Sequence, residues 1–385
     1  MNASLGIAML GCGHIAKQHS RMLRSLDPSV RRYGASRFPA RAEDFVRDTQ
    51  ADGWFPSYDA ALSAPHIDAV LVATPPLHHL ELTLSALAAG KHVIVEKPAF
   101  ISPADCRTVA RAAADAGRRV LVATPPLHHL ALTLSALAAG KHVIVEKPAF
   151  ISPADCRTVA RAAAEAGRLV LVAENYAYKP LARVLRDVIG SGEIGDVRFV
   201  LLNALKYRRA SDWRDDAELA GGGALFEGGV HWIDLLANLG LTVESVQGFW
   251  PGNQRGDERS MAVVAQYEEG GVGVLLHSWE TPSLLRGARL SRVTGVRGSI
   301  TFESNGAFAL IRGRRSRLVV PSLRDAGGYR AMLRDFLRVL TEGGEPLMTL
   351  ARAEQSLSLI REAYVTGGVA TAASLVVNGQ PDRAA

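Results

Sequence analysis

A near-exact internal repeat is the feature that most restricts how this chain can fold. Residues 71–120 recur at 121–170 with three differences. These are Glu81 to Ala131, Asp115 to Glu165 and Arg119 to Leu169. Solenoid repeats keep a pattern while their sequences drift, so such close identity indicates a recent duplication within one domain rather than a repeat architecture. Both copies therefore compete for one position in the fold.

Strands and helices alternate from the start of the chain to about residue 175. The segment 68–73 is rich in Val and Leu without polar alternation, as in a strand with both faces covered. The expected strands are 4–10, 31–35, 68–73 and 92–95, and the expected helices 14–26, 40–49, 77–89 and 103–116. This order predicts an α/β domain with a doubly wound parallel sheet at residues 1–175, which contains both repeats.

After Pro180 the pattern changes to longer segments with strand-like alternation. Turns with glycine, at 269–271 and 305–306, separate several of them and predict hairpins. The expected strands are 197–206, 261–267, 272–279, 298–303 and 307–312, and the expected helices 181–189, 328–340 and 350–365. Residues 176–385 are therefore predicted to form a second, α+β domain with a large antiparallel sheet.

Composition narrows the classes of partner. The net charge is +6 and the isoelectric point about 9.4, but only seven of 44 basic residues are lysines, and the arginines are spread among acids. This distribution does not resemble a nucleic-acid patch. No apolar run is long enough for a membrane span. The three cysteines have neither metal-ligand spacing nor an even count, so we expect no metal and a reducing, cytoplasmic setting.

A glycine-rich turn follows the first expected strand and opens the first expected helix. It reads Gly11-Cys12-Gly13-His14-Ile15-Ala16. In this context glycines allow a tight turn and close approach of a pyrophosphate to the helix N-terminus. The turn predicts dinucleotide binding.

The end of the second expected strand bears on which dinucleotide binds. NAD sites usually carry Asp or Glu there, whereas this chain has Ser36 and Arg37, with Arg41 one turn later. A guanidinium can pair with a 2′-phosphate, and no carboxylate would repel it. NADP is therefore preferred, with NAD as the alternative.

Candidate catalytic groups stand in both halves of the chain. Each repeat ends a strand in Glu-Lys-Pro, which places Lys97 or Lys147 at the carboxyl edge of a sheet. Further on, Glu227 precedes His231 by four residues, a spacing at which the carboxylate could orient an imidazole suited to proton transfer.

These motifs together, with Ala-Thr-Pro-Pro-Leu-His-His at 73–79, resemble the glucose-fructose oxidoreductase, inositol dehydrogenase and MocA (Gfo/Idh/MocA) family. The resemblance implies an NAD(P)-dependent oxidoreductase that acts on sugars, polyols and their derivatives, and a second domain that forms homo-oligomers. It implies that the Glu-Lys-Pro lysine binds the substrate hydroxyl, that His231 is the general acid/base and that Glu227 stands where many members have aspartate. The cofactor contacts it implies are Gly11, Gly13, His14, Ile15, Ser36, Arg37, Thr74, Pro75, His79, Glu96 and Glu146. The substrate contacts it implies are Asn175, Tyr176, Trp213, Arg214 and Asp234.

The repeat leaves two arrangements open. If the first copy fills the sheet, residues 120–123 can take the last strand position and the second copy must extend the sheet or leave it. If the second copy leads into the second domain, Lys147 faces His231 and the first copy is surplus. We favour Lys147 over Lys97. Alternative functions are a non-catalytic NADP(H) sensor, a redox-assisted glycosidase of the same family and a disabled product.

Overall fold

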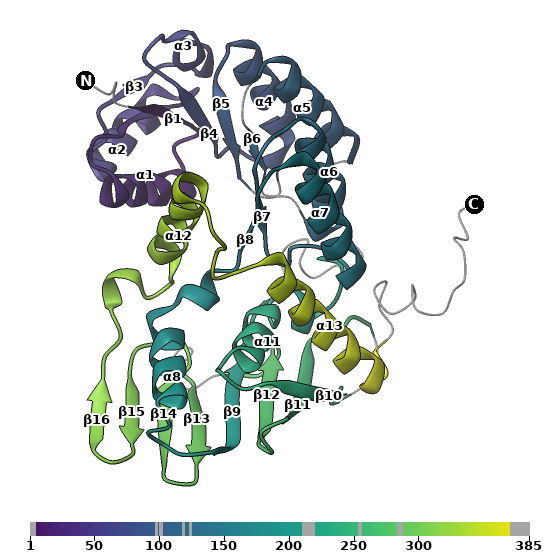
Figure 1. The fold of residues 1–385 in the computed structure, drawn as a ribbon. Helices are drawn as coiled ribbons and strands as arrows, with labels where there is room; N and C mark the ends of the chain where they lie inside the picture. Colours follow the sequence, from purple (N-terminus) through teal and green to yellow (C-terminus); the bar gives the residue numbers. More distant parts are fainter. Residues whose placement is uncertain are drawn as a thin grey trace. The chain divides into compact units, whose positions relative to one another are not determined.

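The computed structural model describes residues 5–96, 99, 103–117, 120–122, 125–209, 220–252, 256–282 and 288–369. The chain divides into two compact units, Met1–Lys141 and His142–Ala385 (Figure 1). The division falls inside the second repeat. The predicted extent of the dinucleotide-binding domain, 1–175, is a separate matter and stays a prediction.

The described part of the first unit holds a parallel sheet with strands in the order β3-β2-β1-β4-β5-β6. Its strands are β1 (Gly6–Leu10), β2 (Arg31–Ala35), β3 (Gly53–Phe55), β4 (Ala69–Val72), β5 (His92–Val95) and β6 (Val120–Val122). Its α-helices are α1 (His14–Leu26), α2 (Pro39–Thr49), α3 (Tyr58–Ser63), α4 (His79–Ala88), α5 (Pro103–Asp115) and α6 (His129–Ala138), and short 3₁₀ turns η1 (Pro76–His78) and η2 (Pro126–His128) precede α4 and α6.

Both faces of this sheet are buried, as the uninterrupted apolar strands predict. Ile7 and Met9 of β1 pack into one core cluster, while Ala8 and Leu10 pack into another. Successive side chains of a strand point to opposite faces, so each face needs its own layer of helices. The predicted doubly wound parallel sheet is confirmed.

The two repeats occupy different places. In the first unit, β5 of the first repeat pairs with β4, and β6 at the repeat junction takes the next position. The second repeat does not extend this sheet. Its strand β7 (Val143–Glu146) instead pairs with β8 (Val170–Ala173) in a separate two-stranded parallel sheet of the second unit, and α7 (Pro153–Ala166) connects them.

The start of α7 shows how the repeat sequence ends one element and begins the next. Ser152 accepts a hydrogen bond from the backbone N–H of Asp155, whose carboxylate in turn accepts one from the Ser152 N–H. Pro153 occupies the first turn, where its missing N–H costs nothing. Ser102, the equivalent residue of the first repeat, lies outside the described residues.

The second unit is built on a large sheet in the order β10-β11-β12-β9-β13-β14-β15-β16, antiparallel except for the parallel pair of β9 and β12. Its strands are β9 (Val197–Leu205), β10 (Val243–Phe249), β11 (Ser260–Tyr267), β12 (Val272–Ser278), β13 (Leu290–Gly295), β14 (Gly298–Glu303), β15 (Ala309–Arg312) and β16 (Ser316–Val319). Its α-helices after β8 are α8 (Pro180–Gly190), α10 (Ala224–Glu227), α11 (Val230–Ala237), α12 (Tyr329–Glu342) and α13 (Leu350–Thr366), with 3₁₀ turns η3 (Asn175–Tyr178) and η6 (Leu323–Asp325).

Helices cover one face of this sheet. Helix α11 contacts β9 and β12, and α13 contacts β10 (Figure 1). Along β9, Val200 and Leu202 are buried while Phe199 and Leu201 are 62% and 41% exposed. The alternation leaves the opposite face of this strand open and partly apolar. In the described part of the chain, no helix is long and apolar enough to cross a bilayer.

Candidate active site

The glycine-rich turn has the geometry of a pyrophosphate cradle. Gly11 adopts a φ of +102°, and a Cβ there would lie 2.8 Å from the carbonyl oxygen of Ala73, so only glycine fits. A Cβ at Gly13 would meet nothing of the protein within 4 Å. Gly13 caps α1, whose first residues His14 and Ile15 are exposed. An open glycine at a helix N-terminus fits a dinucleotide phosphate.

At the end of β2, Ser36 and Arg37 lie as the sequence predicts. Ser36 is buried, and its hydroxyl accepts a hydrogen bond of 3.1 Å from the Phe38 N–H. Arg37 is exposed beside Tyr58. Burial raises the pKa of Tyr58, while the charge and hydrogen bond of Arg37 oppose the rise, as does the charge of Arg41. Two cations therefore stand where an NAD site usually has a carboxylate.

The loop after β4 carries Thr74, Pro75 and His79. The Thr74 hydroxyl is buried and has no hydrogen-bond partner among the described residues, which suits a polar ligand. Pro75 is exposed. His79 is 1% exposed, and its ring nitrogens face the carbonyl oxygens of Ala99 (3.0 Å) and Thr74 (2.7 Å). His79 therefore fixes the loop, and its predicted cofactor contact stays a prediction.

Two glutamates predicted as cofactor contacts, Glu96 and Glu146, lie at the carboxyl ends of β5 and β7, one in each repeat. Glu96, after β5, forms an ion pair with His19 on α1. Glu146, the last residue of β7, is exposed. Lys97, Trp213 and Arg214 were also predicted as site residues, and all three lie outside the described residues.

Lys147, at the end of β7, is held by Glu227. Its Nζ donates to the Glu227 backbone carbonyl oxygen at 2.9 Å and to Glu227 Oε1 at 3.1 Å. The side chains are 16% and 10% exposed. Contacts to both the main chain and the side chain fix the ammonium at the carboxyl end of the strand.

His231 is held by a carboxylate that the sequence reasoning missed. Its Nδ1 lies 2.6 and 2.7 Å from the two carboxylate oxygens of Glu174, which directly follows β8 and is 1% exposed. Burial alone would raise the pKa of Glu174, but the charge and hydrogen bond of His231, the Tyr176 N–H and the charge of Lys147 hold it below its ordinary value. The buried Glu174 carboxylate is therefore ionised and orients the imidazole.

This arrangement corrects the expectation that Glu227 orients His231. The expectation assumed one continuous helix, in which residues four apart face each other. Instead α10 ends at Glu227 and α11 begins at Val230, with Gly228 and Gly229 between them. The break directs Glu227 to Lys147. The sequence could have pointed to Glu174 through its position directly after an expected parallel strand, because ligands of α/β sheets bind at the carboxyl ends of the strands.

Tyr176 fixes the imidazole from its face. The two rings stack with centroids 4.2 Å apart and planes 13° apart. On the other side, Lys179 Nζ lies 3.4 Å from the Tyr176 ring centroid. Asn175 is buried and donates to the Gly327 carbonyl oxygen at 2.6 Å. Of these two residues, both predicted as substrate contacts, Tyr176 stacks on His231, whereas Asn175 anchors the neighbouring loop.

Asp234 is paired with Arg352. It is 1% exposed, and its two oxygens each accept a hydrogen bond of 2.6 Å from Arg352 on α13. A bidentate pair uses both carboxylate oxygens and leaves little capacity for substrate. The predicted role as a substrate contact is therefore replaced by a structural one, the attachment of α11 to α13.

A second buried carboxylate, Glu258, holds the N-terminal end of α10. Its Oε2 accepts hydrogen bonds from the Leu225 N–H (2.9 Å) and the Tyr364 hydroxyl (3.0 Å), and its other oxygen is unpartnered among the described residues. Tyr364 also accepts a hydrogen bond from the Phe226 N–H. Burial raises the pKa of Glu258 to about 7.

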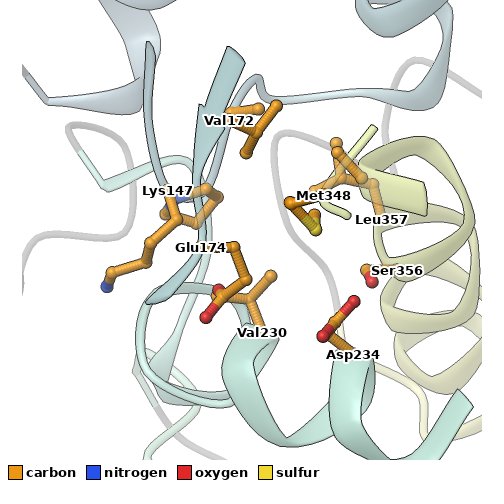
Figure 2. Close-up of a pocket in the computed structure, with 11 residues that line it drawn as sticks. Lys147, Val172, Glu174, Val230, Asp234, Met348, Ser356 and Leu357 are labelled. Carbon is orange, nitrogen blue, oxygen red and sulfur yellow. The ribbon is translucent and has the colours of Figure 1, made fainter. Parts of the chain in front are cut away.

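A small cavity lies beside these residues of the second unit. Lys147, Glu174, Asp234 and Ser356 contribute to its lining, with apolar side chains around them (Figure 2). Its volume of about 10 Å³ has room for about one water molecule. In Figure 2 the Lys147 side chain extends away from this cavity. This cavity is too small to hold a sugar. No cluster of three or more His, Cys, Asp or Glu suited to a metal occurs within the described ranges.

Comparison with known proteins identifies the family. A model described as "Oxidoreductase family, NAD-binding Rossmann fold" matches residues 5–123 and again 118–174, so that its second match covers the second repeat. The "GFO/IDH/MocA C-terminal domain" model matches residues 182–301.

Similar proteins agree with these matches. An inositol 2-dehydrogenase from Streptomyces avermitilis is 38% identical over 122 residues, which is 31% of this chain and 35% of that protein. The aligned part thus spans about a third of the length of that relative. A putative UDP-kanosamine synthase oxidoreductase subunit from Amycolatopsis mediterranei is 27% identical across 86% of this chain and 87% of that one.

The fold also agrees. The crystal structure of an aldose-aldose oxidoreductase from Caulobacter crescentus, complexed with glycerol, superposes with a TM-score of 0.58. The two proteins are 18% identical, and the match covers 95% of this chain and 98% of that one. By its sequence matches and by its fold, the chain belongs to the Gfo/Idh/MocA oxidoreductase family.

Proposed function

We propose that the protein is an NAD(P)-dependent oxidoreductase that transfers a hydride between nicotinamide and a secondary alcohol of a sugar, polyol or derivative. The observation that carries the proposal is the pairing of His231 with the buried Glu174, in the same unit as the fixed Lys147 ammonium. A base and a cation are the two groups that alcohol oxidation requires.

His231 takes the hydroxyl proton. Glu174 binds Nδ1 and so leaves Nε2 as the nitrogen that accepts the proton. The ionised carboxylate then stabilises the imidazolium, and stacking on Tyr176 fixes the plane of the ring. In the reverse direction the same imidazolium returns the proton to a carbonyl oxygen.

Lys147 binds the reacting oxygen. An ammonium has three N–H donors, and the backbone and side chain of Glu227 accept two of them. The third can donate to the substrate hydroxyl and stabilise negative charge as the proton leaves. We assign this role to Lys147 in preference to Lys97.

The first unit supplies the cofactor site. The open position at Gly13, the N-terminus of α1 and the unpartnered Thr74 hydroxyl support dinucleotide binding, and Arg37 supports NADP as the preferred form over NAD. When bound, the nicotinamide supplies the hydride acceptor or donor.

We also infer a homo-oligomer and a small-molecule, carbohydrate-like substrate. The exposed Phe199 and Leu201 on the open face of β9 support association between copies of the chain. Sedimentation of the purified protein, with Phe199→Ser as the variant, tests this inference.

A turnover assay tests the proposed function. The full chain is incubated with NADP⁺ or NAD⁺ and a panel of sugars, polyols and glycosides, and cofactor reduction and free sugar are followed. We expect reduction by at least one polyol or sugar, abolished in Lys147→Met and retained in Lys97→Met. Cofactor binding without turnover would instead support a sensor, release of sugar without net reduction a glycosidase, and neither binding nor turnover a disabled product.

A further inference from the structure

Three cationic side chains of the second unit pack on aromatic rings near the catalytic groups. Lys179 lies over Tyr176, Lys206 lies 6.0 Å from the Trp279 ring centroid, and the Arg289 guanidinium lies 5.5 Å from that of Trp232. Among the described residues, none of these three side chains has a carboxylate within salt-bridge distance. Buried cations usually have such a partner.

Arg289 is close enough to each of the two lysines for their positive charges to repel. Burial lowers the pKa of Lys179 to about 8; the charge of Arg289 acts in the same direction, and the charges of Glu174 and Glu303 only partly oppose the fall. Burial also lowers the pKa of Lys206; the charge of Glu227 opposes this fall, and the charges of Arg289 and Lys147 add to it. For both lysines, burial makes the protonated form less favourable, and a bound anion would stabilise that form.

Arg289 also offers an unused donor. It is 9% exposed, and one terminal nitrogen donates to Asn305 at 2.6 Å, but its buried Nε has no hydrogen-bond partner among the described residues. The nearby His277 adds no negative charge, because burial and the charges of Lys206 and Arg289 lower its pKa to about 3. An unmade bond to a buried guanidinium is costly.

This group of cations, Lys179, Lys206 and Arg289, adjoins the proposed catalytic residues. Tyr176 has Lys179 on one face and His231 on the other. Lys206 interacts electrostatically with both Glu227 and Lys147. A group bound by these cations would thus belong to the same molecule whose hydroxyl meets Lys147.

We propose that the substrate is an anionic sugar, whose carboxylate or phosphate is bound by Lys206 and Arg289, with Lys179 adding to the positive field. Charge-assisted hydrogen bonds from a guanidinium and an ammonium are the usual means by which proteins recognise such groups. The proposal rests on the proposed function, because it assigns the substrate class of the same site.

The test compares anionic sugars with neutral ones. The full chain with its preferred cofactor is assayed on a hexuronate, a hexose phosphate, a nucleotide-diphosphate sugar and the parent neutral hexoses, and binding of each sugar is measured separately by calorimetry. We expect kcat/KM at least tenfold higher for one anionic compound than for its neutral counterpart. The three anionic compounds distinguish a carboxylate, a phosphate monoester and a diphosphate.

Variants locate the preference. Lys206→Met removes the charge but keeps an unbranched side chain, and it should reduce the anionic-to-neutral ratio of kcat/KM about tenfold. Arg289→Gln should act in the same direction. Arg314→Met, an exposed change at the turn between β15 and β16, controls for general loss of charge. Equal use of both classes by the unaltered protein, or a ratio unchanged in Lys206→Met, would overturn the proposal while leaving the oxidoreductase assignment intact. Binding of an anionic sugar that Lys206→Met weakens, without any turnover, would support the anion site and reject the oxidoreductase assignment.

Discussion

Replacing Glu258 with glutamine should change how the stability of the second unit depends on pH. The carboxyl is 2% exposed, and burial raises its pKa from 4.5 to about 7. Below pH 4.5 it is protonated in the folded and unfolded states alike. As the pH rises from 4.5 to 7, the unfolded state ionises first, so this group progressively lowers the free energy of unfolding.

The size of the effect follows from the same two values. Each factor of ten between the two acid constants corresponds to about 1.4 kcal/mol, so the full loss above pH 7 is about 3 kcal/mol. Between pH 5 and pH 8 the loss is about 2.5 kcal/mol, since part of the ionisation of the unfolded chain is complete at pH 5. Glutamine keeps an acceptor for the Leu225 N–H but cannot ionise.

Urea unfolding at pH 5, 6, 7 and 8, followed by tryptophan fluorescence, measures this difference. The buried Trp232 and Trp279 report on the second unit. Relative to the unaltered protein, Glu258→Gln should gain about 2.5 kcal/mol as the pH rises from 5 to 8. The exposed Glu342→Gln controls for loss of one carboxylate. A difference between Glu258→Gln and the parent that stays constant over this range would refute the reasoning.

Three further changes test the site and its support. Glu174→Gln should lower kcat/KM by about 10² or more and shift the acidic limb of its pH profile, and Glu174→Asp should restore part of the activity; a parallel loss without a change in the pH profile would indicate a structural role only. Asp234→Ala leaves Arg352 buried without its partner and should destabilise the second unit by about 3–5 kcal/mol in chemical unfolding, against a change within about 0.5 kcal/mol that would show the pair to be dispensable. Arg37→Ala should raise the KM for NADP(H) about tenfold with little effect on that for NAD(H), and an equal effect on both would remove the basis for the NADP preference.

Much of the fold followed from local patterns. Strand β5 and helix α1 begin and end where the sequence predicts, because apolar runs between a glycine turn and a capping position leave few alternatives. The strands β3, β10, β13 and β16 were not anticipated. Strand β16 is largely exposed and lacks an apolar pattern. Such strands owe their pairing to the neighbouring strand of the sheet rather than to their own residues.

The candidate site was predicted in part. The sequence identified Lys147 and His231 as candidate site residues, because both stand in recognisable motifs. It did not identify Glu174 as the partner of His231. Glu174 and His231 are 57 residues apart, and their contact depends on how β8 and α11 pack. Nor could the sequence decide between the two repeats, since a near-identical sequence has no local reason to prefer one position. That choice depends on long-range strand pairing.

Because the two repeats are nearly identical, one of them can be removed without introducing a foreign residue at the junction. Removing residues 71–120 would join Val70 to Leu121, and the new junction would reproduce the original sequence of β4 without a single altered residue. The sequence of β5 recurs at residues 142–145, and β7 comprises the last three of these residues and Glu146. Strand β7 would then be the natural neighbour of β4. The shortened chain would thus have an unaltered β4 followed by a single copy of the repeat.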